Sequence, residues 1–180
     1  MNQIISLIIL ISFSLTSFAN EIAITFDDSP REATGYFNGV TRAKKLLLEL
    51  KKANIKEVAF FSVSSKINKE GKKRIEMFAR AGHIIANHTH NHPDFNQLGI
   101  NEYIDDFKKA DELLSKFSNY QKWFRFPYLR EGNEVTKRDI MRETLKNLGY
   151  KNAYITVNNY DWYMENQFQE AIKKNQKLDF

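Results

Sequence analysis

Short apolar runs alternate along this chain with segments in which apolar residues recur at helical spacing. The apolar runs predict five strands, at residues 22–26, 58–63, 83–86, 123–126 and 153–157. Four helices are predicted between them, marked by Ala43, Leu46, Leu47, Leu50 and Ala53, by Ile75, Phe78 and Ala79, by Tyr103, Ile104, Phe107, Leu114 and Phe117, and by Ile140, Met141, Thr144 and Leu148. This alternation is typical of an α/β fold with a parallel sheet, either open or closed into a barrel.

Residues that favour helix ends support this division. Asn54, Gly82 and Gly149 each follow a predicted helix, at positions where asparagine or glycine commonly ends one. Thr136 is a candidate cap at the start of the fourth helix. The segment from residue 165 to 180 has the pattern of a polar helix with no strand after it.

Polar clusters follow the first, third, fourth and fifth predicted strands. They begin at Asp27, Asn87, Pro127 and Asn158. Because right-handed crossovers bring the carboxyl ends of parallel strands to one rim, clusters that are distant in sequence are expected to meet in space. Barrel enzymes build their sites on that rim, so the sequence predicts a functional site there.

Composition narrows the class of protein. The chain has 180 residues, of which 42% are hydrophobic, 27% charged and 13% aromatic, which suits one folded domain and argues against disorder. The absence of cysteine excludes disulfide scaffolds, thiolate metal sites and a cysteine nucleophile. The net charge of +5 comes from scattered basic pairs, which indicate solvated helix faces rather than a nucleic-acid-binding surface.

The first nineteen residues resemble an export signal. Residues 4–15 are mostly apolar but too short to span a bilayer comfortably, and Ser17 and Ala19 supply the small residues read by a signal peptidase. We therefore expect a signal peptide at 1–19, a domain at 20–180, no membrane span after cleavage, and a secreted or periplasmic protein. The segment lacks the usual basic residue, and an uncleaved anchor or a buried first helix is the alternative.

Two of the polar clusters contain candidate metal ligands. Asp27 and Asp28 are adjacent carboxylates that cannot easily both stay ionised at low dielectric without a cation, although Asp-Asp-Ser-Pro also suits a solvated turn. His88, His90 and His92 lie within five positions, and two imidazoles with one carboxylate leave a position for water, as in catalytic zinc sites. Spacing alone does not choose between His88 with His90, His88 with His92, and a polar loop without a metal.

The other two clusters add a cation, a carboxylate and aromatic side chains. Arg125 lies in an otherwise aromatic strand and requires a carboxylate partner, for which Asp27 and Asp161 are the candidates. Trp162 follows Asp161 and suits either sugar stacking or core packing. His83, which opens a strand alone, is interpreted as structural.

These four clusters together resemble the motifs of the polysaccharide deacetylases with a NodB homology domain, carbohydrate esterase family four. Residues 25–30 read T-F-D-D-S-P where the family has T-F-D-D-G-P, and residues 88–92 match H-[ST]-x-x-H. Residues 125–128 match R-x-P-Y, and residues 161–162 match the D-W of a fourth motif. The resemblance covers about residues 22–163 and implies a deformed (β/α) barrel of the NodB type.

The resemblance also implies a role for each matched residue. Asp28, His88 and His92 would hold a divalent metal, usually Zn²⁺, with Co²⁺, Ni²⁺ or Mn²⁺ as alternatives, and His90 would take no part. Asp27 would be the general base that activates water for attack on an acetamide, and Arg125 would hold it in place. The remaining implied roles are a backbone N–H donor to the oxyanion at Tyr128, a wall of the acetyl pocket at Trp162, and an orienting carboxylate at Asp161. The implied substrates are N-acetylated glycans such as peptidoglycan, chitin-like chains or other N-acetylglucosamine polymers.

Three departures from the family pattern qualify this expectation. Ser29 replaces the usual glycine, Asn158 stands where many relatives have aspartate, and the fifth motif, L-x-H, has no match because no histidine follows Trp162. We therefore expect a C-terminally truncated form that lacks the general acid, whose loss typically slows such reactions about 10²–10⁴-fold. Acetylxylan O-deacetylation and a non-catalytic metal- or glycan-binding remnant are alternatives. An iron facial triad of an oxygenase is opposed by the βα alternation.

Overall fold

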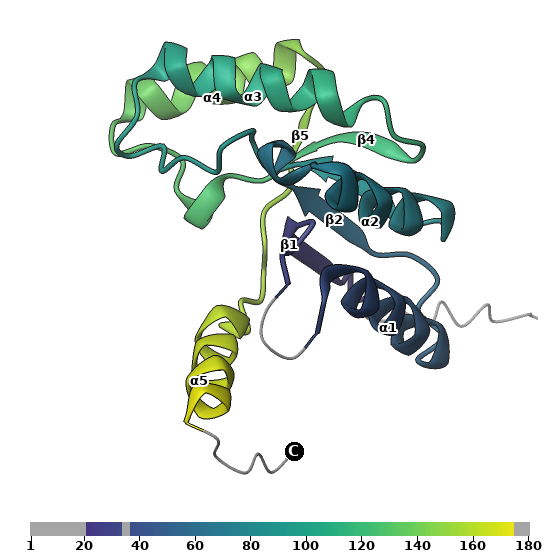
Figure 1. The fold of residues 1–180 in the computed structure, drawn as a ribbon. Helices are drawn as coiled ribbons and strands as arrows, with labels where there is room; N and C mark the ends of the chain where they lie inside the picture. The colour runs from purple at the N-terminus through teal and green to yellow at the C-terminus, as the bar shows by residue number, and fades with distance from the viewer. Residues whose placement is uncertain (1–20, 34–36, 175–180) are drawn as a thin grey trace, which may run out of the picture.

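The computed structural model describes residues 21–33 and 37–174, which form one parallel sheet with helices packed on it (Figure 1). The strands are β1 (Thr25–Ser29), β2 (Ala59–Ser62), β3 (Ile84–Asn87), β4 (Tyr120–Phe124) and β5 (Lys151–Asn152). The α-helices are α1 (Gly39–Lys52), α2 (Lys69–Arg80), α3 (Ile100–Leu114), α4 (Val135–Asn147) and α5 (Asp161–Lys173). Two short 3₁₀ turns are η1 (Ser64–Lys66) and η2 (Pro127–Leu129).

The strands lie in the order β1-β2-β3-β4-β5, and every neighbouring pair is parallel. This arrangement confirms the α/β class and the parallel sheet expected from the alternation of patterns. Because all five strands run the same way, their carboxyl ends share one edge of the sheet. In the described part of the chain, β1 and β5 are the edge strands.

The two faces of the sheet bury different side chains. Phe60 and Ile85 pack with apolar residues of α1, α2 and α3, and Phe124 packs with residues of α3 and α4. The alternate residues, which include Phe61 and Ala86, form a separate cluster that, among the described residues, contains none from a helix. Helices therefore cover one face, as they cover the outside of a β/α barrel wall.

Local signals set most helix boundaries. The side chains of Asn38 and Asn68 accept hydrogen bonds from the backbone N–H groups of Thr41 and Gly71, at 2.8 and 2.9 Å, and so cap α1 and α2. The three predicted stop residues all have left-handed backbone conformations just beyond a helix: Asn54 (φ 57°), Gly82 (φ 90°) and Gly149 (φ 76°). The predicted cap at Thr136 was wrong, because α4 begins one residue earlier, at Val135.

Three strand predictions also require correction. The strand predicted at 123–126 was displaced, because β4 comprises Tyr120–Phe124 and Arg125 follows it. Strand β1 lies three residues later than the predicted 22–26, so Asp27 and Asp28 belong to the strand rather than to the turn after it. The predicted strand at 153–157 was wrong, because β5 comprises only Lys151 and Asn152 and the residues after it leave the sheet. The backbone N–H of Ala153 still donates to the carbonyl of Phe124 at 2.8 Å, but the rest of the run at 153–157 is not in a strand, and Val157 is 84% exposed.

Helix α5 lies apart from the sheet at the end of an extended segment (Figure 1). It agrees with the helical pattern seen after residue 165, but begins at Asp161 and has no buried residue. Among the described residues, no helix combines the length and the apolar character that a membrane span needs. The predicted signal peptide at 1–19 lies outside the described residues.

Candidate metal centre

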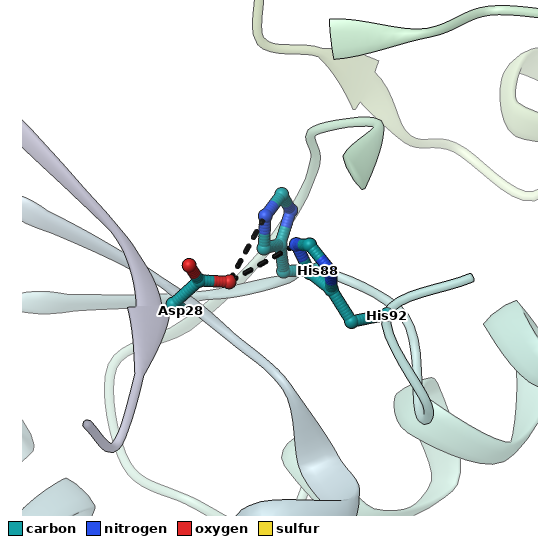
Figure 2. Close-up of side chains that lie close together, drawn as sticks. All are labelled: Asp28, His88 and His92. Atoms are coloured by element: carbon teal, nitrogen blue, oxygen red, sulfur yellow. Dashed lines mark ion pairs between the residues drawn. The ribbon is translucent and has the colours of Figure 1, made fainter. Parts of the chain in front are cut away.

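Three side chains from two strand ends converge at the carboxyl edge of the sheet (Figure 2). Asp28 comes from β1, and His88 and His92 come from the loop after β3. One ligand atom from each lies within 4.8 Å of the other two. Oδ1 of Asp28 is 3.0 Å from Nε2 of His92 and 3.9 Å from Nε2 of His88. The convergence of these residues, some sixty positions apart in sequence, is therefore confirmed.

An irregularity in β1 aims Asp27 and Asp28 at different partners. The pairing register with β2 shifts between Phe26 and Ser29, and Asp28 has a left-handed backbone conformation (φ 60°). A bulge of this kind redirects side chains that would otherwise alternate strictly between the two faces. Ser29 is not among the residues with positive φ, so the glycine of the family motif is not required here by backbone conformation.

The tautomer of His88 follows from its hydrogen bond. Nδ1 of His88 lies 2.8 Å from the backbone carbonyl oxygen of Arg125, which can only accept a hydrogen bond, so Nδ1 carries the proton. In the neutral ring this leaves the lone pair on Nε2, the atom that faces Asp28. A histidine that binds a metal through one nitrogen usually donates from the other to a carbonyl or carboxylate.

The electrostatic environment favours a neutral imidazole and an ionised carboxylate. Burial lowers the pKa of His88 below its ordinary value of 6.5, and only 2% of its surface is exposed. The close approach of the His92 imidazole holds the pKa of Asp28 well below its usual range. Oδ1 of Asp28 is buried, and its close neighbours are the two imidazole nitrogens, Nε2 of His92 at 3.0 Å and Nε2 of His88 at 3.9 Å. A nitrogen–nitrogen–oxygen donor set with such a carboxylate fits a divalent cation such as Zn²⁺.

The third histidine of the motif is turned elsewhere. Nδ1 of His90 is hydrogen-bonded to Oγ of Ser64 at 2.7 Å, so its ring contacts η1 rather than Asp28. The backbone N–H groups of Ser64 and Ser65 donate to the carbonyls of Thr89 and His90 at 3.2 and 3.0 Å. Of the two pairings that the spacing left open, His88 with His92 is therefore the one that faces the carboxylate.

Arg125 pairs with Asp27, one of its two predicted partners. Its Nη1 lies 2.7 Å from Oδ1 of Asp27 and also donates to Oγ1 of Thr25 at 2.8 Å. Its Nε donates to the carbonyl of Ala153 at 2.9 Å, and its guanidinium lies over the ring of Phe61 at 4.0 Å. Arg125 thus links β1 to the residue that follows β5 and orients the Asp27 carboxylate.

Tyr128 lies beside the candidate ligands in η2. Its ring meets that of His92 edge-on, with 4.7 Å between the centroids, and the guanidinium carbon of Arg130 lies 5.7 Å from the centroid of the Tyr128 ring. Arg130 in turn forms an ion pair with Asp94. The aromatic side chain therefore borders the site, while its backbone has a left-handed conformation (φ 56°).

Asp161 and Trp162 do not join this cluster. Both open α5, and both fall in a helix rather than directly after a strand. Trp162 is 55% exposed, and its ring meets that of Tyr163 edge-on at 6.0 Å. In the described part of the chain, Asp161 forms no ion pair, and its backbone N–H donates to Asn159 at 3.3 Å. Their roles in orienting a proton donor and in walling a pocket stay predictions.

Left-handed backbone conformations concentrate around the candidate ligands. Within residues 21–33 and 37–174, non-glycine residues with positive φ include Asp28, Thr89, His92, Tyr128 and Leu129, all in the segments that form the site. Such conformations are unfavourable for residues with a Cβ and persist where the surroundings determine them. Their concentration at one edge is typical of a functional site.

One buried carboxylate that contacts the site was missed in the sequence. Asp106 of α3 is 9% exposed and accepts hydrogen bonds from the loop between His88 and His92. The signal was present, because Asp106 lies at helical spacing from Tyr103 and Ala110 on the apolar stripe of that helix. A charged residue on such a stripe requires a buried partner.

Comparison with known proteins agrees with this geometry. The sequence model of the family described as polysaccharide deacetylase matches residues 16–153. The peptidoglycan-N-acetylmuramic acid deacetylase PdaA of Bacillus subtilis (strain 168) is 32% identical over 146 residues, which cover 81% of this chain and 50% of that protein. A peptidoglycan-N-acetylglucosamine deacetylase of Bacillus cereus is 29% identical over 143 residues, which cover 79% of this chain and 46% of that protein.

Solved structures show the same fold. The crystal structure of the Bc1960 peptidoglycan N-acetylglucosamine deacetylase, in complex with 4-naphthalen-1-yl-N-oxidanyl-benzamide, matches with a TM-score of 0.56 and 26% identity. That match covers 69% of this chain and 53% of the other. The chain thus spans about half the length of the curated relatives it matches.

Proposed function

This chain belongs to the polysaccharide deacetylase family, and we propose that it is a metal-dependent hydrolase that removes acetyl groups from N-acetylated glycans. The relatives named above act on peptidoglycan, which makes glycans containing N-acetylglucosamine or N-acetylmuramic acid the first substrates to test. A secreted or periplasmic location, after removal of residues 1–19, would bring the protein to such a polymer. Mass spectrometry of the exported protein tests that location, with Asn20 expected as its first residue.

The observation that carries the proposal is the hydrogen bond from Nδ1 of His88 to the carbonyl of Arg125. It places the lone pair of the buried His88 imidazole on Nε2, which lies 3.9 Å from Oδ1 of Asp28, a carboxylate whose pKa the nearby His92 holds well below its usual range. With Nε2 of His92, these atoms make a ligand set for Zn²⁺, and Co²⁺, Ni²⁺ and Mn²⁺ are alternative occupants. A cation held there would supply Lewis acidity, lowering the pKa of a coordinated water and polarising a carbonyl oxygen.

The neighbouring residues suit the proton and charge movements of amide hydrolysis. Asp27 presents a carboxylate whose Oδ1 is held by Arg125, so its Oδ2 is available to accept a proton from the attacking water. The backbone N–H of Tyr128 would donate to the oxyanion that forms from the acetyl carbonyl. Trp162 would border the acetyl group, as the family pattern implies. Because this chain has no histidine after Trp162 for Asp161 to orient, the proton that Asp27 takes from the water would have to pass to the departing amine.

Acetate release tests the activity itself. Purified protein loaded with Zn²⁺ is incubated with peptidoglycan, with N-acetylglucosamine oligomers and with acetylxylan, and acetate is measured enzymatically. We expect release from the N-acetylated substrates, and a loss of at least about 10²-fold in Asp27→Asn, which keeps an oxygen for Arg125 but loses the base. Equal rates for wild type and Asp27→Asn would favour a non-catalytic glycan- or metal-binding protein instead.

Metal retention tests the ligand set independently of turnover. Asp28→Ala, His88→Ala and His92→Ala should each lose stoichiometric zinc in elemental analysis after dialysis. His90→Ala is the matched control, because its ring bonds Ser64 and faces away from Asp28, and it should keep wild-type zinc content. The same zinc content in all four variants would contradict the assignment.

A further inference from the structure

The loop that carries both candidate histidine ligands is held from outside by one side chain of α3. Oδ1 of Asp106 accepts hydrogen bonds from the backbone N–H groups of His90 and Asn91 at 2.7 and 3.0 Å. Its Oδ2 accepts from the side-chain amide of Asn91 at 2.6 Å and from the Asn91 backbone N–H at 3.2 Å. Both carboxylate oxygens are thus used by the two residues at the centre of the loop.

The Asp106 carboxylate receives its hydrogen bonds mainly from the ligand loop, because its other surroundings are apolar. The side chain emerges from the apolar face of α3, which packs on the sheet through Tyr103, Phe107 and Ala110. In the described part of the chain, no lysine or arginine forms an ion pair with Asp106. Because a buried carboxylate is costly unless it is well hydrogen-bonded, the helix and the loop must keep a defined separation. The adjacent Asp105 is exposed.

The loop needs such support because its backbone is unfavourable on its own. Thr89 and His92 have φ values of 67° and 57°, and neither is a glycine. Within the loop, Oγ1 of Thr89 accepts from the His92 N–H at 3.0 Å, and Oδ1 of Asn87 accepts from the Thr89 N–H at 2.8 Å. These bonds fix the two ends of the loop, and Asp106 fixes the segment between them.

We propose that Asp106 is a positioning residue for the metal centre, which holds the loop so that Nε2 of His88 and Nε2 of His92 face Asp28 together. It touches neither the metal nor the substrate, and acts through the backbone of His90 and Asn91. The inference rests on the proposed function, because it takes the Asp28, His88 and His92 cluster to bind a metal. Residues that orient metal ligands in this way typically change metal affinity about 10–100-fold when they are altered.

Zinc affinity measured by competition with a chromophoric chelator tests the proposal on the metal-free protein. Asp106→Ala removes both acceptors and should weaken zinc binding 10–100-fold. Asp106→Asn keeps one oxygen for the two backbone N–H groups but places an amide against Asn91, and should give an intermediate loss. Asp105→Asn makes the same chemical change at the exposed neighbour and should bind zinc as wild type does.

The absorption spectrum of the Co²⁺-loaded protein separates positioning from general destabilisation. If Asp106 sets ligand geometry, the d–d bands of the bound Co²⁺ should change in position or intensity in Asp106→Asn. Urea unfolding of the same variant should show that it is folded. If Asp106→Ala does not fold, Asp106→Asn still decides the outcome. Wild-type zinc affinity and an unchanged Co²⁺ spectrum in Asp106→Asn would overturn the proposal.

The same titration distinguishes failure of this inference from failure of the proposed function. His88→Ala removes a candidate ligand and should abolish tight zinc binding. If His88→Ala binds zinc as tightly as wild type, the metal centre itself is wrongly assigned. If His88→Ala loses zinc while the Asp106 variants keep wild-type affinity and spectrum, the centre stands and only the role of Asp106 is wrong.

Discussion

Replacing Arg125 by methionine should destabilise the metal-free protein strongly. Methionine keeps most of the aliphatic stem but removes the guanidinium, which bonds Asp27, Thr25 and the carbonyl of Ala153. The first of these partners is a carboxylate, and the side chain of Arg125 is only 5% exposed. The substitution therefore removes three hydrogen bonds, and water can reach their acceptors poorly in this buried position.

The expected loss is about 3 kcal/mol in the free energy of unfolding. Removing one partner of a buried ion pair costs about 3–5 kcal/mol, because the other charge is left without compensation. Here the abandoned carboxylate of Asp27 is 34% exposed and can regain water, which places the loss at the lower end of that range. The carbonyl of Ala153 and the hydroxyl of Thr25 also lose their donors.

Urea unfolding followed by circular dichroism at pH 7.5 in the presence of EDTA measures this loss. Arg130→Met is the matched control, because Arg130 also pairs with an aspartate, Asp94, but is 50% exposed. An exposed pair contributes at most about 1 kcal/mol, so the control should unfold within that margin of wild type. The m-value should stay constant in both variants, so that the midpoints report stability.

A double-mutant cycle with Asp27→Asn isolates the contact between the two side chains. A charge-assisted hydrogen bond of this kind should give a coupling energy of about 1–2 kcal/mol. If Arg125→Met costs no more than Arg130→Met and the coupling to Asp27 is zero, Arg125 does not hold the base, and the argument from burial is wrong.

Two further predictions concern parts of the fold remote from the candidate metal centre. Burial lowers the pKa of His83 below 6.5, so as the pH falls through this range the unfolded chain takes up a proton more readily than the folded chain, and the folded state loses stability. His83→Leu should therefore lose less stability than wild type between pH 7.5 and 5.5, measured by urea midpoints. An equal loss in both proteins would contradict this. The Asp111 carboxylate accepts from the hydroxyls of Tyr120 and Tyr150, so Asp111→Ala should lower the free energy of unfolding by about 2 kcal/mol, and an unchanged midpoint would show that the hydroxyls find other partners.

The parts of the fold that the sequence predicted are those governed by local patterns. Apolar spacing located the four helices α1 to α4, and Asn54, Gly82 and Gly149 marked three of their ends because few other residues adopt positive φ there. The strand at 153–157 failed for the opposite reason. An apolar run predicts a strand only if a neighbour pairs with it, and pairing is a property of the whole sheet.

The candidate site also has features that local patterns predicted and features that depend on the packing of the whole fold. The grouping of Asp28, His88 and His92 followed from residue type, strand-end position and resemblance to a family pattern. The irregular register that separates Asp27 from Asp28 did not, because a bulge depends on the pairing with β2. The contact of Asp106 with the ligand loop depends on how α3 packs, and no spacing rule connects residue 106 with residues 90 and 91.

Helix α5 has thermodynamic consequences of its own, because none of its residues is fully buried, although Phe168 and Ile172 are half-buried. Glu165 joins it to Arg31 and Arg42 at 3.8 and 3.7 Å, and partly exposed pairs of this kind add at most about 1 kcal/mol. Its amide protons should exchange with solvent when the helix detaches or frays, at an opening free energy well below that of global unfolding. The unit that melts cooperatively includes Ala153, whose carbonyl bonds Arg125, and substitutions at exposed positions of α5 such as Trp162 should change its melting temperature little.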